Sequence, residues 1–183
     1  YLISNAFHLC SLIGDPEINR SLGEVTNTLC EGELIQLEHR DDHTLDESLY
    51  NTIVQKKTAS LIGVSCRMGA VLSGGGARVV ECMERFGIAA GVAFQITDDV
   101  LDLVGVQEVV GKSVGKDLDK GKLTLPVIFS LASADQQKRL VLLELLRTCD
   151  LSGLKDILLE DGSVHLALKR AQDLVTDAKS ALN

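Results

Sequence analysis

Three closely spaced aspartates stand at the end of an apolar stretch of the sequence. Asp98, Asp99 and Asp102 follow residues 88–96, which are mostly apolar or small. On a helix, residues i and i+4 lie on one face and residue i+1 flanks them, so the three carboxylates are expected to converge on one patch. Clustered anions repel one another, and a hard divalent cation relieves that repulsion. The spacing therefore predicts a Mg²⁺ site, with a solvated acidic helix end as the alternative.

Lysines form a second set of candidate residues. Lys57 lies beside Thr58 inside a predicted helix, while Lys112, Lys116 and Lys122 lie in or next to a glycine-bearing loop over residues 105–121. Glycine lets the backbone approach a ligand closely, and ammonium groups act as point charges for phosphate. The loop lacks the spacing of a Walker P-loop, and a solvated loop is its alternative interpretation. Acids and lysines on neighbouring helices together predict a metal-bridged polyphosphate.

The elements that must position these residues are helical. Only two prolines occur, and apolar residues recur with helical spacing along the chain. Two turn signals, Gly14-Asp15-Pro16 and Gly74-Gly75-Gly76, interrupt this pattern. The pattern predicts helices over residues 2–13, 18–37, 45–73, 77–103, 126–133, 135–148, 150–160 and 163–182. No segment alternates with a period of two for long enough to indicate a strand. We therefore expect an all-α, bundle-like fold forming a single domain over residues 1–183.

Composition narrows the possible functions. With 45% hydrophobic residues the chain can build a sizeable core, while a net charge of −8, 3% aromatic residues and no Trp argue against nucleic-acid binding. Five cysteines without a Cys-x-x-Cys motif predict unpaired thiols in a reducing compartment, the cytoplasm. No apolar run approaches the roughly 20 residues of a transmembrane helix, so we expect no membrane span.

Four ordered motifs resemble one family, the trans-polyprenyl diphosphate synthases, and among them the long-chain octaprenyl or solanesyl type. The motifs are Glu31-Gly32-Glu33-x-x-Gln36, Lys57-Thr58-Ala59-Ser60-Leu61, the segment 94–102 that contains the three aspartates, and the segment 111–126 that contains Lys112 and Lys122. The similarity covers residues 1–126, with a helical tail after them.

The resemblance implies the helical bundle of isoprenoid synthases, usually a homodimer. It also implies an enzyme that condenses an allylic prenyl diphosphate with isopentenyl diphosphate, head to tail, with Mg²⁺ as cofactor. Carried over by motif, the three aspartates form the second aspartate-rich motif and hold Mg²⁺. The residues that would face the allylic diphosphate are Lys57, Thr58, Gln95, Lys112 and Lys122.

The sequence departs from the family pattern at its beginning. The family's first aspartate-rich motif, with the arginines after it and the isopentenyl diphosphate site, is expected upstream of Tyr1. We therefore interpret the chain as a C-terminal portion of a synthase, with the N-terminal helices absent, and expect these 183 residues alone to be inactive. Two alternatives stay open: a non-catalytic helical subunit of a heteromeric synthase, and a terpene cyclase on a similar bundle.

Overall fold

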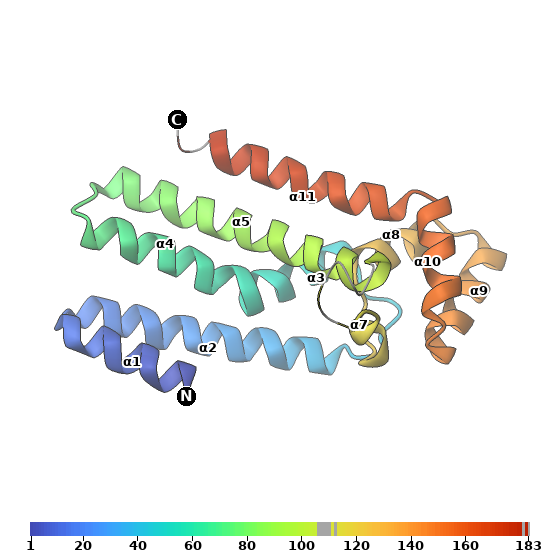
Figure 1. The fold of residues 1–183 in the computed structure, drawn as a ribbon, viewed down its shortest axis with the longest axis horizontal. Helices are drawn as coiled ribbons and strands as arrows, with labels where there is room; N and C mark the ends of the chain where they lie inside the picture. Colours follow the sequence, from blue (N-terminus) through green and yellow to red (C-terminus); the bar gives the residue numbers. More distant parts are fainter. Residues whose placement is uncertain (106–110, 112, 181, 183) are drawn as a thin grey trace.

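The computed structural model describes residues 1–105, 111, 113–180 and 182, and all secondary structure within these residues is helical (Figure 1). This agrees with the all-α fold expected from the periodicity. The elements are α1 (Leu2–Ile13), α2 (Pro16–Glu38), α3 (Glu47–Val54), a π-helix (Gln55–Ala59), α4 (Ser60–Leu72), α5 (Ala77–Val104), α7 (Lys116–Asp119), α8 (Leu125–Ser133), α9 (Gln136–Thr148), α10 (Leu151–Glu160) and α11 (Ser163–Ser180).

Local chemistry explains where the first helices begin and end. Gly14 closes α1 in the left-handed conformation, with φ of 74°, which glycine adopts without steric cost. Asp15 then caps α2, because its Oδ1 accepts the backbone N–H of Glu17 at 2.8 Å, and Pro16 occupies the first turn. The predicted break at Gly14-Asp15-Pro16 is thus confirmed.

The long helices run side by side, and two shorter ones cross one end of the bundle. In Figure 1, α1, α2, α4, α5 and α11 lie roughly parallel, with α9 and α10 standing across them at the right. Helix α5 is the central element, since α4 and α11 both pack along it. The core is dominated by aliphatic side chains, and its most completely buried members include Ile96, Leu125, Leu142, Leu154 and Leu158.

Two elements differ from the sequence prediction. The helix expected over residues 45–73 is divided into α3, the π-helix and α4, and the loop expected over residues 105–121 contains the short helix α7. The π-helix lies where two glycines permit close approach. A Cβ on Gly32 of α2 would lie 2.6 Å from the backbone nitrogen of Lys57, and one on Gly91 of α5 would lie 2.6 Å from Cα of Ala59.

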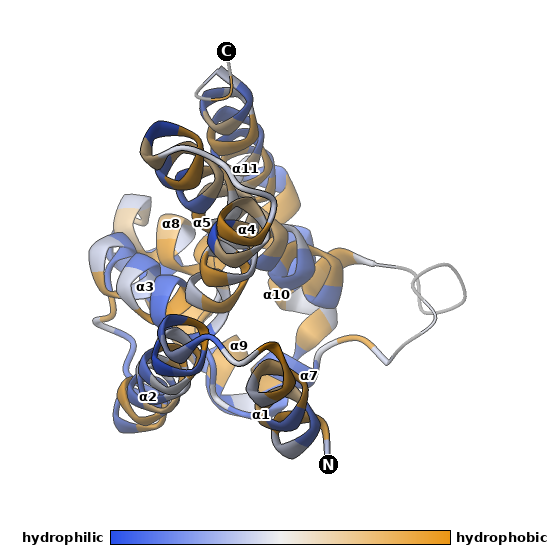
Figure 2. Cartoon of the chain, turned by 90° about the vertical axis from the view of Figure 1, so that its left-hand side faces the viewer, coloured by the Kyte–Doolittle hydropathy of each residue, from blue (hydrophilic) through white to orange (hydrophobic). Residues whose placement is uncertain are grey.

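One outer face of the bundle is apolar. Helix α1 has no buried residue, and Leu2, Leu9 and Leu12 are 82%, 62% and 69% exposed. In the end-on view of Figure 2, α1 lies away from the central α5, and its ribbon alternates between hydrophobic and hydrophilic colours. No helix among the described residues is long and apolar enough to cross a membrane.

Candidate active site

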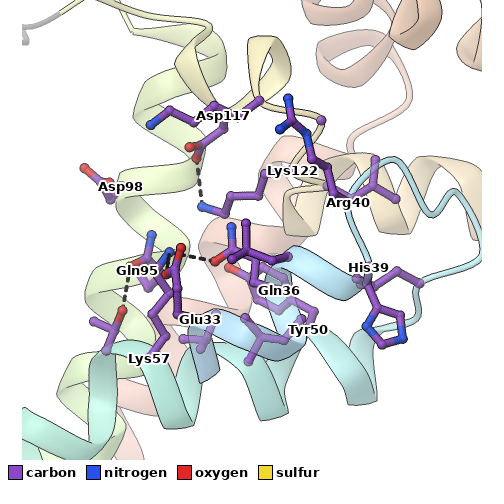
Figure 3. Close-up of a pocket in the computed structure, with 18 residues that line it drawn as sticks. Glu33, Gln36, His39, Arg40, Tyr50, Lys57, Gln95, Asp98, Asp117 and Lys122 are labelled. Atoms are coloured by element: carbon purple, nitrogen blue, oxygen red, sulfur yellow. Dashed lines mark hydrogen bonds and ion pairs between the residues drawn. The ribbon is translucent and has the colours of Figure 1, made fainter. Parts of the chain in front are cut away.

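A pocket of about 410 Å³ lies where α2, α3, the π-helix and α5 meet the segment that follows α7 (Figure 3). Its walls combine two kinds of side chain. The aliphatic part includes Leu37, Leu45, Ile53, Val54 and Leu123, and the charged part includes Glu33, Arg40, Lys57, Asp98, Asp117, Lys120 and Lys122. Cations and carboxylates beside apolar walls suit a ligand with a charged head and a hydrocarbon tail.

The π-helix supplies two of the predicted site residues. Lys57 Nζ lies 2.6 Å from Glu33 Oε2 and donates to Gln36 Oε1 at 2.8 Å, so α2 holds this ammonium group at the pocket. On the other side, the Thr58 hydroxyl donates to Gln95 Oε1 at 2.9 Å, which ties the π-helix to α5. Single π-helical turns are frequent at functional sites, and this one places adjacent residues between two helices.

We expect Gly32→Ala to destabilise the chain by about 1–3 kcal/mol, because the new Cβ would overlap backbone that cannot move without shifting the π-helix. The nearest atoms are the backbone nitrogen of Lys57 at 2.6 Å and Cβ of Lys56 at 2.8 Å. Urea unfolding measures the loss. Gly23→Ala in the same helix is the matched control, since nothing lies within 4 Å of its Cβ position and alanine favours a helix. Equal stability of the two variants would contradict the prediction.

Asp99 lies beneath the pocket and is 0% exposed. Its Oδ2 accepts the Tyr50 hydroxyl at 2.8 Å, and its Oδ1 accepts Gln95 Nε2 at 2.8 Å and Lys122 Nζ at 2.6 Å. Lys122 Nζ also reaches Asp117 Oδ2 at 2.8 Å (Figure 3). One buried carboxylate therefore gathers donors from α3, α5 and the segment after α7.

Burial and charge act in opposite directions on this pair. Burial raises the pKa of Asp99, against the lowering effect of the Lys122 ammonium and of the hydrogen bonds from Lys122 and Gln95. Burial alone would lower the pKa of Lys122, but the carboxylates of Asp99 and Asp117 raise it above its ordinary value. Burial, followed by the charge of Asp99, also raises the pKa of Tyr50 far above its usual range. The tyrosine therefore remains a hydrogen-bond donor.

The other two aspartates have different surroundings. Asp102 is 4% exposed, and its carboxylate accepts the backbone N–H groups of Lys116 at 3.3 Å and Asp117 at 2.9 Å, at the start of α7. Asp98 is half-buried and lines the pocket. The three carboxylates thus follow the predicted helical spacing without sharing one patch. Among the described residues, no group of three or more His, Cys, Asp or Glu side chains is arranged to hold a metal ion.

The structure brings most of the predicted residues to one place. Lys57, Thr58, Gln95, Asp98 and Lys122 all line the pocket. Asp99 is joined to them by hydrogen bonds, Asp102 instead holds α7, and Lys112 lies outside the described residues.

Sequence reasoning assigned no role to several residues of this site, among them Tyr50 and Asp117. Tyr50 lies on the buried face of α3 with Ile53 and Val54, and a buried tyrosine hydroxyl needs a hydrogen-bond partner. That requirement was a usable signal. Asp117 lies within the 111–126 motif, but nothing indicated its role, because it follows a run of glycines and lysines whose path the sequence does not fix.

Comparison with known proteins identifies the same family similarity over most of the chain. A sequence model of the Polyprenyl synthetase family matches residues 1–157. A short chain isoprenyl diphosphate synthase of Methanothermobacter thermautotrophicus is 33% identical over 188 residues, which cover 99% of this chain and 58% of that protein. The heptaprenyl diphosphate synthase component 2 of Bacillus subtilis is 33% identical over 145 residues, covering 78% of this chain and 41% of that protein.

Solved structures of polyprenyl synthases are similar to this chain in fold as well. The crystal structure of a polyprenyl synthase from Caulobacter crescentus, complexed with calcium and isoprenyl diphosphate, has a TM-score of 0.92 and 29% identity. The alignment covers 98% of this chain and 56% of that one. The chain thus spans about half the length of the relatives it matches, between 41% and 58% in these three comparisons.

Proposed function

The chain belongs to the polyprenyl synthetase family, and from this we propose that the protein containing it joins an allylic prenyl diphosphate to isopentenyl diphosphate. One observation carries the proposal: Lys57, Lys122 and Asp98 line a single pocket together with aliphatic side chains. The charged residues suit a diphosphate, and the aliphatic wall suits a prenyl chain.

The proposed reaction begins with cleavage of the allylic C–O bond, which releases diphosphate and leaves an allylic cation. The double bond of isopentenyl diphosphate then attacks this cation, a new C–C bond forms, and a proton is lost. Lys57 and Lys122 stabilise the departing diphosphate, because its negative charge grows as the bond breaks. The aliphatic wall, which includes Ile53 and Val54, keeps water from the cation.

Mg²⁺ is the proposed cofactor, and the pocket suits it. Asp98 and Asp117 both line the cavity, and Mg²⁺ is usually held by one or two carboxylates with waters and substrate phosphates. We propose Asp98 as the principal ligand of the acidic motif, since it is the aspartate of this motif that lines the pocket. When bound, the ion neutralises charge on the diphosphate. Thr58 and Gln95 face the diphosphate in the same pocket and orient it. Lys112 remains a proposed diphosphate contact on the basis of the motif alone.

The test is condensation of an allylic diphosphate with labelled isopentenyl diphosphate by the full-length protein that contains this chain. We expect a product lengthened by five-carbon units and complete loss of turnover when EDTA removes Mg²⁺. Release of a cyclic hydrocarbon would favour a terpene cyclase. Absence of both turnover and Mg²⁺-dependent diphosphate binding would favour a non-catalytic subunit and contradict the proposal.

We also propose that the protein acts as a homodimer in the cytoplasm. The exposed leucines of α1 support self-association, because apolar patches of this kind mark interaction sites. The name of the Bacillus subtilis relative, component 2, points to a second possibility, a partner of a different sequence. The mass of the purified full-length protein by light scattering separates them: twice the chain mass supports the homodimer, and a monomer that is active only with another protein contradicts it.

A further inference from the structure

Tyr50 is the least expected member of the site. It is 2% exposed, it comes from α3, and its hydroxyl is 2.8 Å from Asp99 Oδ2. This hydrogen bond occupies the one polar group of the side chain. Tyr50 therefore acts on the site through Asp99 rather than by offering a donor to a ligand.

Asp99 in turn fixes a cation of the pocket. Its other oxygen, Oδ1, accepts Gln95 Nε2 at 2.8 Å and Lys122 Nζ at 2.6 Å. The Lys122 side chain is 16% exposed, so its ammonium reaches the pocket from a largely buried position. Because the carboxylate is planar, a bond to one oxygen constrains the direction in which the other presents its lone pairs.

We propose that Tyr50 is a positioning residue, which orients the Asp99 carboxylate and thereby sets where Lys122 presents its ammonium group to a diphosphate. The inference rests on the proposed function. Without the hydroxyl, Oδ2 is buried with one donor fewer, and the carboxylate can rotate toward Gln95 or Lys122. The ammonium then loses its fixed position between Asp99 and Asp117, without any change of charge in the pocket.

The test variant is Tyr50→Phe, which removes one oxygen atom and keeps the ring in the core. In the full-length protein, we expect KM for the allylic diphosphate to rise roughly five- to tenfold, together with a fall in kcat. A loss of folded protein alone lowers the apparent kcat and leaves KM unchanged. A rise in KM therefore distinguishes a positioning role from a purely structural one. Independently of activity, the ¹⁵N NMR signal of the Lys122 ammonium, assigned by its absence in Lys122→Met, should broaden through faster proton exchange.

Two controls match this variant. Tyr1→Phe changes the other tyrosine, which is 97% exposed, and Val164→Ala weakens the core in α11. Both should keep the wild-type KM and the wild-type Lys122 signal. If Tyr50→Phe lowers stability but leaves KM and the signal unchanged, the positioning role is refuted while the proposed function stands. If the wild-type protein shows no prenyl transfer, the proposed function fails, and the Lys122 signal still decides whether Tyr50 positions this lysine.

Discussion

Replacing Lys122 with methionine will lower the free energy of unfolding by about 3–5 kcal/mol, because removal of one partner of a buried ion pair leaves the other charge uncompensated. The partner is Asp99, which is 0% exposed and lies 2.6 Å from Lys122 Nζ. The remaining donors, Tyr50 and Gln95, are neutral and offset only part of that loss. Chemical unfolding of wild type and variant measures the difference.

Two further variants show whether the loss arises from the buried charge. Lys120→Met removes a nearby lysine that is exposed, and it should change the free energy of unfolding by less than about 0.5 kcal/mol. The double variant Asp99→Asn with Lys122→Met removes both members of the pair and should be more stable than Lys122→Met alone. If the double variant is instead destabilised by the sum of the two single losses, the pair does not act as a unit.

The pH dependence of stability should identify the same pair. The carboxylates of Asp99 and Asp117 raise the pKa of Lys122 above its ordinary value of 10.5. A group whose pKa is raised by folding stabilises the protein fully below its unfolded pKa, and that contribution is lost as the pH rises through the folded value. The gap between wild type and Lys122→Met should therefore narrow as the pH rises above 10.5. A gap that widens in this range would show the opposite sign.

Helix positions followed from the sequence where the responsible chemistry is local. Gly14 and Pro16 end and begin helices through their own backbone preferences, and the turn at Gly74 separates α4 from α5 as predicted. The π-helix has no such signature. Its residues, including Lys57 and Thr58, are compatible with an ordinary α-helix, and the widened turn depends on how closely α2 and α5 approach it.

In the acidic motif too, local sequence predicts some features, while others depend on residues that are distant in the sequence. Helical spacing correctly places Asp98, Asp99 and Asp102 on neighbouring positions of α5. Spacing does not reveal which donors meet each carboxylate, since Tyr50 is 49 residues away from Asp99 and Asp117 is 15 residues away from Asp102. Three identical side chains therefore acquire different surroundings, and only the tertiary structure distinguishes them.

This distinction leads to the prediction with the largest effect on activity. In the full-length protein, Asp98→Asn should lower the rate of the proposed Mg²⁺-dependent prenyl transfer about 100- to 1,000-fold and raise the Mg²⁺ concentration needed for half-maximal rate. Asp98 lines the pocket, so the substitution weakens a proposed metal ligand while keeping the shape of the side chain. Steady-state rates over a Mg²⁺ titration measure both quantities.

Asp156→Asn is the matched control, because it removes one carboxylate from an exposed position on α10 and should leave the rate and the Mg²⁺ requirement unchanged. Asp102→Asn separates the two parts of the motif. Its carboxylate receives backbone N–H groups at the start of α7, so the loss should appear mainly in thermal stability, with the Mg²⁺ requirement near that of wild type. If Asp102→Asn shifts the Mg²⁺ requirement and Asp98→Asn does not, the assignment of the metal to Asp98 is wrong, since the carboxylate beside α7 would then be the one that binds it.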